Sequence, residues 1–186
     1  MWEWLILIII ICVIIFLIYY WVTVYNGFLY YQQLINEKLS NIEVLMQKRI
    51  DLIMTIIKVA KTYNLHENST FKETAGARNK WKPDASVNER VTAMSDMDEN
   101  FLKVNAVVEQ YPALKADLLN NNVLQNDVEV EKELMDERFK YNKLVKEYNY
   151  EISFFPQSII ARFYNFSLCK FLQFDEKSKI YEQIKI

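Results

Sequence analysis

Few residue types in this 186-residue chain have side chains suited to catalysis or metal binding. A general base or a metal site usually needs several ligands close together, and the chain has one histidine, His66, and two cysteines, Cys12 and Cys169. His66 is followed by Glu67, and this pair with Glu73 is the candidate for a hard-cation or hydrolase site. The competing interpretation gives His66-Glu67 a role in capping or packing a helix end. We therefore expect no enzyme activity, cofactor or metal.

Two arginines, Arg49 and Arg138, are more informative, because each interrupts an otherwise apolar helical seam. A buried charge without a partner is costly. We expect the arginines to pair across the fold with Glu131, Glu109 or Asp51 and so to fix the register of neighbouring helices. The alternative is that their aliphatic stems lie along the edge of the core while the guanidinium groups reach water.

Two Tyr-Asn pairs recur seven residues apart, at Tyr141-Asn142 and Tyr148-Asn149, so both lie on one face of a helix. We expect core tyrosines whose hydroxyls reach a polar partner, with a ligand site as the alternative. A later aromatic set either closes one end of the core or docks on a membrane or a partner. It comprises Phe154, Phe155, Phe163, Tyr164, Phe166, Phe171 and Phe174.

Composition narrows the classes of fold and partner. Lys and Arg number 22 against 24 Asp and Glu, and the formal net charge is −2. Such a chain lacks the basic surface that holds a phosphate backbone, so nucleic acid is not expected as a partner. Two glycines and three prolines supply too little turn chemistry for many strands. The elements that position the polar residues are therefore expected to be helices.

Residues 1–24 predict a transmembrane anchor. Every residue from Trp4 to Trp21 is apolar or aromatic, and no charge occurs between Trp4 and Asn36. About 20 such residues span roughly 30 Å as a helix, and Trp and Tyr at both ends suit the two bilayer interfaces. A cleaved signal peptide would instead show a basic start and small residues near the cut. Lys38, after the run, favours a cytoplasmic position for the rest of the chain.

Residues 25–186 predict a helical bundle. Apolar residues step by three or four within about 35–63, 86–111 and 112–155, where Pro112 and Pro156 mark boundaries. Shorter helices are expected at 68–80, 159–166 and 168–182. Gly27 is the one helix breaker between the apolar run and Ile35, so the spanning helix is expected to continue into the first bundle helix. The predicted fold is all-α, with an N-terminal transmembrane helix continuing into an up-and-down antiparallel helical bundle.

Several motifs have a spacing typical of one family. They are Tyr25-Asn26, residues 40–44 and 48–53, Tyr63, His66-Glu67, Ala77-Arg78, residues 106–116, Arg138, Tyr141-Asn142, Tyr148-Asn149, Phe155-Pro156 and residues 159–161. With these motifs the chain resembles the LemA family of bacterial single-pass membrane proteins. It departs from the family at Leu39, usually Trp; at Met54, usually Pro; and at residues 120–122, usually more apolar. Tyr164-Asn165-Phe166 stands where a Phe-Gly-Phe-like turn is common.

The resemblance implies a bundle anchored in the bacterial inner membrane, without established catalytic residues. Our leading hypothesis is an interaction or scaffold module that binds other membrane or envelope proteins, with self-association as a further option. A membrane-organising or lipid-binding protein is the alternative. The third hypothesis is a metal-dependent hydrolase that uses His66, Glu67 and nearby carboxylates.

Overall fold

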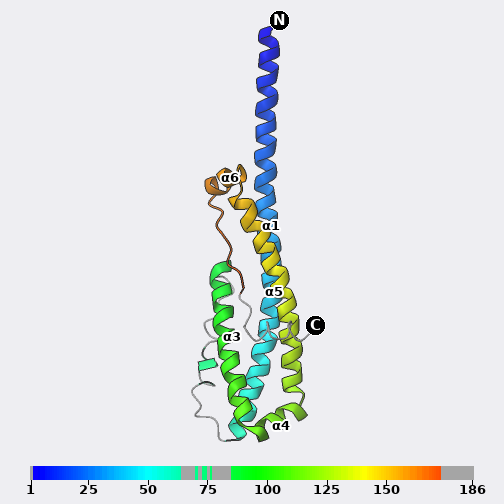
Figure 1. The fold of residues 1–186 in the computed structure, drawn as a ribbon, viewed down its shortest axis with the longest axis vertical. Coiled ribbons are helices and arrows are strands. Elements are labelled where there is room, and N and C mark those ends of the chain that lie inside the picture. The colour runs from blue at the N-terminus through cyan, green and yellow to red at the C-terminus, as the bar shows by residue number, and fades with distance from the viewer. Residues whose placement is uncertain (1, 64–69, 71–72, 75, 77–84, 173–186) are drawn as a thin grey trace, which may run out of the picture. The chain divides into compact units, whose positions relative to one another are not determined.

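The computed structural model describes residues 2–63, 70, 73–74, 76 and 85–172 (Figure 1). Within these ranges every regular element is a helix. The helices are α1 Trp2–Thr62, α3 Val87–Gln110, α4 Pro112–Asn120, α5 Val123–Ser153 and α6 Gln157–Phe163. This confirms the predicted all-α class, with a long N-terminal apolar helix followed by a helical bundle.

The chain divides into two compact units, and α1 and α5 each contribute to both. One unit, here called the junction unit, comprises residues 1–37 and 143–169; the other, the bundle unit, comprises residues 38–142 and 170–186. The helix α1 continues without a break through Gly27, as expected, and so passes the expected boundary after residue 24. A membrane anchor of residues 1–24 stays a prediction.

The burial of α1 changes along its 61 residues. Its large apolar side chains are exposed from Trp2 to Tyr19, and this part of the helix is long and apolar enough to cross a membrane. Farther along, buried residues recur at helical spacing, at Phe28, Ile35, Leu39, Ile42, Met46, Ile53, Ile56 and Ala60. One helix therefore combines an exposed apolar segment with a face that packs against other helices.

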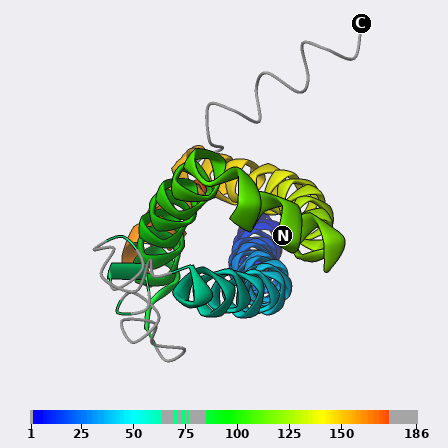
Figure 2. The same cartoon turned by 90° about the horizontal axis from the view of Figure 1, so that it is seen from below.

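In the bundle unit, α1 and α3 run in one direction and α5 runs in the opposite one (Figures 1 and 2). Cross-helix pairs show this order, because Glu43 and Arg49 on α1 meet Arg90 and Asp98 on α3. Along α5 the order of contacts with α1 is reversed, because Arg49 meets Asp127 whereas the earlier Met46 meets the later Arg138. Between the helices lie the buried side chains of Val91, Met94, Phe101, Val104, Leu134 and Tyr141. The expected antiparallel packing therefore holds for α5 against both α1 and α3.

The ends of α3 follow from its sequence. The Ser86 hydroxyl accepts a hydrogen bond from the Glu89 N–H at 3.4 Å, and the Glu89 carboxylate accepts one from the Ser86 N–H at 2.9 Å. This reciprocal pair satisfies two N–H groups that would otherwise lack partners. At the other end α3 stops at Gln110, and Pro112 begins α4. The expected helix over 86–111 is confirmed.

The single helix expected over 112–155 is wrong, because the chain forms α4 and α5 with a break between them. Asn122 has φ 57°, a left-handed conformation that ends a helix and that asparagine adopts more readily than most residues. The three asparagines at 120–122 were a signal for this break, since asparagine favours turns. After the break, α5 runs from Val123 to Ser153.

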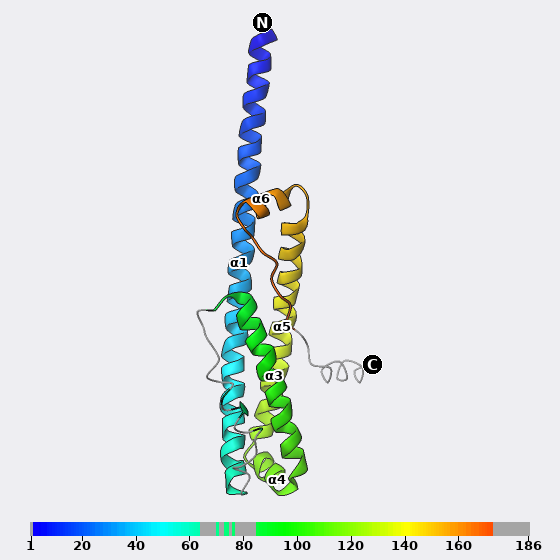
Figure 3. The same cartoon turned by 90° about the vertical axis from the view of Figure 1, so that its left-hand side faces the viewer.

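The helices expected after Pro156 need two corrections. The first is α6, which is shorter than the expected 159–166 and is followed by a turn at Asn165 with φ 57° (Figure 3). Asparagine adopts this left-handed conformation more readily than most residues other than glycine. The second expected helix, 168–182, does not form at residues 168–172, which lie outside any helix. Residues 173–182, and most of the helix expected at 68–80, lie outside the described residues.

Candidate functional site

A buried ion-pair network joins three helices of the bundle unit. Arg49 on α1 is buried, and its Nε lies 3.3 Å from Oδ1 of Asp127 on α5. Its other nitrogens lie 3.5 Å from a Glu131 oxygen and 3.7 Å from an Asp98 oxygen. The guanidinium carbon also lies 5.1 Å from the centre of the Phe101 ring, within cation–π range. Arg49 therefore contacts α3 and α5 at once.

Arg138 on α5 enters the same network through Asp98. Its Nη2 lies 2.7 Å and 2.9 Å from the two Asp98 carboxylate oxygens. The same nitrogen donates to the sulfur of Met46 at 3.5 Å, while the buried Nε has no partner among the described residues. Asp98 thus bridges both arginines. Asp98 is buried more deeply than Glu131 and less deeply than Asp127, so solvent only partly screens its two ion pairs.

Some residues of this network are among the expected partners of the arginines, and others are not. Of the three expected acids, Glu131 lies beside Arg49. Glu109 instead forms an ion pair with Lys115 at 2.6 Å, and the Asp51 carboxylate accepts a hydrogen bond from the Gln47 amide at 3.0 Å. Asp98 and Asp127 were not named. Asp127 lies seven residues before Leu134, on the buried face of α5, and Asp98 lies between Met94 and Phe101. Acidic residues at seam positions were therefore the signal that would have found them.

The network holds two guanidinium groups and three carboxylates, and each carboxylate faces a cation. Carboxylates that each pair with an arginine are typical of a structural ion-pair network rather than of a general base. Within the described ranges, no group of three or more His, Cys, Asp or Glu side chains could hold a metal ion. His66 and Glu67, the candidates for metal or hydrolase chemistry, lie outside the described residues. What this arrangement can do is hold helices together, and its role in helix register stays a prediction.

The side chains of the two Tyr-Asn pairs form hydrogen bonds, and most of these go to backbone groups of the segment that follows α6. In the bundle unit, Asn142 exchanges two hydrogen bonds with Leu172: its Nδ2 donates to the Leu172 carbonyl at 2.8 Å, and its Oδ1 accepts from the Leu172 N–H at 2.9 Å. The Tyr141 hydroxyl donates to the Lys170 carbonyl at 3.0 Å. The Lys170 N–H donates to Oδ1 of Asn88 on α3 at 2.8 Å. Residues 170–172 are thus bound by side chains that recognise peptide groups.

The second Tyr-Asn pair does the same in the junction unit. Asn149 exchanges two hydrogen bonds of 2.9 Å with the backbone of Cys169. The buried hydroxyl of Tyr148 accepts from the Gln32 amide at 3.4 Å, and burial raises the pKa of Tyr148. Burial also raises the pKa of the Cys169 thiol, which makes the thiol less reactive. The core position expected for both tyrosines is observed.

An aromatic cluster occurs where the apolar run of α1 ends. In the junction unit, the ring of Trp21 lies 5.7 Å from that of Phe163, edge to face, and its Nε1 donates to the Tyr164 hydroxyl at 3.4 Å. Tyr25 contacts Tyr164, with ring centres 4.5 Å apart, and Phe28 contacts Phe166 at 5.1 Å. Trp4, the other predicted end of the span, is exposed.

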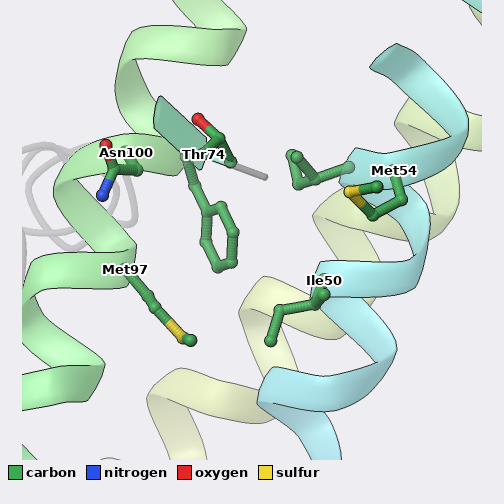
Figure 4. A pocket seen from close by; sticks show the side chains of 7 residues that line it. Ile50, Met54, Thr74, Met97 and Asn100 are labelled. Carbon is green, nitrogen blue, oxygen red and sulfur yellow. The ribbon is translucent and has the colours of Figure 1, made fainter. Parts of the chain in front are cut away.

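A small hollow between α1 and α3 is apolar. Figure 4 shows its lining by Ile50, Met54, Met97, Asn100 and Thr74, and Ile53 and Phe101 complete it. Thr74 donates its hydroxyl hydrogen to the Thr70 carbonyl, and the Asn100 amide donates to the Asp96 carbonyl, so these polar groups bond to the chain itself. The hollow has no charged lining residue and offers nothing to orient a polar ligand.

Comparison with known proteins places these features in a family. The family model described as "LemA family" matches residues 38–186, which confirms the resemblance inferred from the motifs. Two curated relatives are the Magnetosome proteins MamQ 2 and MamQ 1 of Paramagnetospirillum magneticum, each 26% identical to this chain over 175 residues. The match covers 80% of this chain and 64% of each relative, so this chain spans less than two thirds of their length.

Proposed function

The chain belongs to the LemA family, and from this premise we propose that it is a membrane-anchored interaction module. In this proposal α1 fixes the protein in the bacterial inner membrane, and the bundle unit binds other membrane or envelope proteins. Self-association through the same helices is part of the proposal. The cytoplasmic side is proposed for the bundle unit because Lys38 is the Lys or Arg side chain nearest the span.

The observation that carries the proposal is the continuity of α1. An exposed apolar segment from Trp4 to Tyr19, within a stretch that has no charge as far as Asn36, and a buried, packed face from Ile35 to Ala60 belong to one unbroken helix. Exposed apolar surface of this extent is costly in water and favourable in lipid. A role without catalysis is supported by the ion-pair network, whose carboxylates are occupied by arginines.

Three large apolar side chains on the outside of the bundle unit are positions at which a protein partner can be detected. Val44 on α1 and Val128 and Phe139 on α5 are each at least 60% exposed. Isolated exposed apolar residues are ordinary, but they are suitable positions for detecting a partner because they alter no buried contact. The full chain carrying a photoreactive benzoylphenylalanine at one of these positions would be irradiated in intact cells.

The proposal expects discrete adducts with membrane or envelope proteins, or with a second copy, from at least one position. The matched control places the same group in a chain whose span carries two arginines, Ile9→Arg and Ile14→Arg, and should lose those adducts. Absence of adducts from all three positions, with the chain in the membrane, would contradict the interaction role.

A further inference from the structure

We propose that the loop before α6 and the outer side of α6 form a second membrane contact. In this inference Phe155, Ile159 and Phe163 enter the interfacial region of the same bilayer that α1 crosses. The inference rests on the proposed function, because it takes α1 as a membrane-spanning helix. Its ligand is a lipid surface with anionic headgroups.

The position of α6 relative to the apolar run is the first argument. Trp21 is the last residue of that run, and its ring contacts Phe163 while its indole N–H contacts the Tyr164 hydroxyl. Figures 1 and 3 both show α6 beside α1, and all these residues belong to the junction unit. Trp and Tyr favour the level of the headgroups. The rings of Trp21, Tyr25 and Tyr164 therefore place α6 at that level.

The exposure of side chains around α6 is the second argument. Phe155 is 73% exposed and Phe163 is 69% exposed, and Phe154 and Ile159 are also exposed. On the inner side of α6, Ile160 and Ala161 are buried. The short helix thus packs with one side and presents bulky apolar groups on the other. Such side chains gain free energy when they leave water for the boundary between headgroups and acyl chains.

The charge of this region is the third argument, and it favours lipid over a second copy of the chain. Within the junction unit, Arg162 is the charged residue between 152 and 169, and Glu151, the acidic residue just before, accepts a hydrogen bond from the Gln157 amide of α6 at 3.0 Å. Arg162 lies exposed in the last turn of α6. Aromatic and aliphatic groups beside a cation match a surface of anionic headgroups.

The test measures depth in the bilayer with nitroxide labels on the full chain in liposomes of phosphatidylcholine and phosphatidylglycerol. Single cysteines at Phe155→Cys, Ile159→Cys and Phe163→Cys would be made in a Cys12→Ala, Cys169→Ala background. Tyr30→Cys is the matched control, because Tyr30 is an exposed aromatic residue of the same unit, about 13 Å farther along α1 than Trp21. Native Cys12, labelled in Cys169→Ala, reports on the span itself.

We expect the ratio of oxygen to nickel-chelate collisions to be several-fold higher at 155 and 159 than at 30, and highest at Cys12. If the collision ratios at positions 155 and 159 equal the ratio at position 30 while Cys12 lies in lipid, the second membrane contact is overturned and the proposed function still stands. Low collision rates with both reagents would mean that protein covers the site and would overturn it as well. A water-accessible Cys12 would overturn the proposed function. Because Phe163 contacts Trp21, positions 155 and 159 decide the test.

Discussion

At the scale of single residues, Asp98 organises the polar interior of the bundle unit. It pairs with Arg138 at 2.7 Å and lies 3.7 Å from Arg49, so one carboxylate compensates charges from two helices. Arg49 retains Asp127 and Glu131 as further partners, whereas Arg138 has Asp98 as its one ionic contact among the described residues. Removing Asp98 therefore affects Arg138 most, because a buried guanidinium without a carboxylate is strongly disfavoured.

Asp98→Ala is expected to lower the free energy of unfolding by about 3–5 kcal/mol, because it leaves Arg138 buried without a counter-charge. Denaturant unfolding of the full chain in detergent, followed by circular dichroism, measures the change. Asp136→Ala is the matched control: Asp136 forms an exposed ion pair with Lys140, so its loss is expected to cost less than about 1 kcal/mol. Equal effects of the two substitutions would contradict the bridging role.

Arg138→Leu tests whether the network fixes helix register. Replacing a buried charge with an apolar side chain is often neutral or stabilising, so stability alone does not decide the matter. If the arginine fixes register, Arg138→Leu should change the association state of the full chain, measured by light scattering in detergent. Unchanged association together with equal or higher stability would remove the register role.

The contact of Tyr63 with Asp117 gives the bundle unit a dependence on alkaline pH. The Tyr63 hydroxyl donates to the Asp117 carboxylate at 2.7 Å, and this hydrogen bond raises the pKa of Tyr63 above its ordinary value of 10.0. A raised folded-state pKa gives stability that is complete below pH 10 and is lost as the pH passes the folded-state value. The difference in unfolding free energy between the native chain and Tyr63→Phe should therefore shrink above pH 10.

Unfolding of both chains between pH 8 and pH 11 checks this, and the comparison cancels the ionisation of the other tyrosines. Tyr150→Phe serves as the control because Tyr150 is exposed on α5. A difference between native chain and Tyr63→Phe that stays constant across this range would contradict the assignment.

At the scale of elements, the segment after α6 is bound to α5 through asparagine side chains. Each asparagine amide donates to one carbonyl and accepts from one N–H, which reproduces the pairing of a neighbouring strand. The same exchange at Cys169, through Asn149, holds the thiol in a position where burial raises its pKa. The rate at which the Cys169 thiol reacts therefore reports how firmly this segment is bound to α5.

Asn149→Ala, made with Cys12→Ser, is expected to increase the rate of Cys169 alkylation by iodoacetamide at pH 8 about tenfold, because it removes two hydrogen bonds of roughly 1 kcal/mol each. Release also lowers the thiol pKa towards its ordinary value, so the thiolate fraction rises at fixed pH. Asn100→Ala, which removes a bond to the local α3 backbone, is the control. An unchanged Cys169 rate in Asn149→Ala would show that the asparagine does not hold the segment.

At the scale of the whole molecule, the balance between lipid and water depends on the first part of α1. Arginine at the centre of a spanning helix costs about 2.5–3.5 kcal/mol, so Ile9→Arg with Ile14→Arg should remove most of the driving force for insertion. The expected result is loss of the full chain from the carbonate-resistant membrane fraction. Val128→Arg with Phe139→Arg adds the same charge at exposed positions of α5 and should leave the chain in that fraction. Equal retention of both variants would contradict a spanning α1.

The sequence by itself determined the helical class, the long apolar helix that continues through Gly27, and the ends of α3, because periodicity, hydropathy and capping are properties of neighbouring residues. Only the tertiary structure decided which acids meet Arg49 and Arg138, since ion pairs between helices depend on residues far apart in the chain. The break at Asn122 and the absence of a helix at residues 168–172 also escaped prediction. At Asn122 the helical pattern of the sequence competes with a left-handed turn. At residues 168–172 it competes with hydrogen bonds to side-chain amides of α5. In both places the tertiary packing, not the local sequence, determines the conformation.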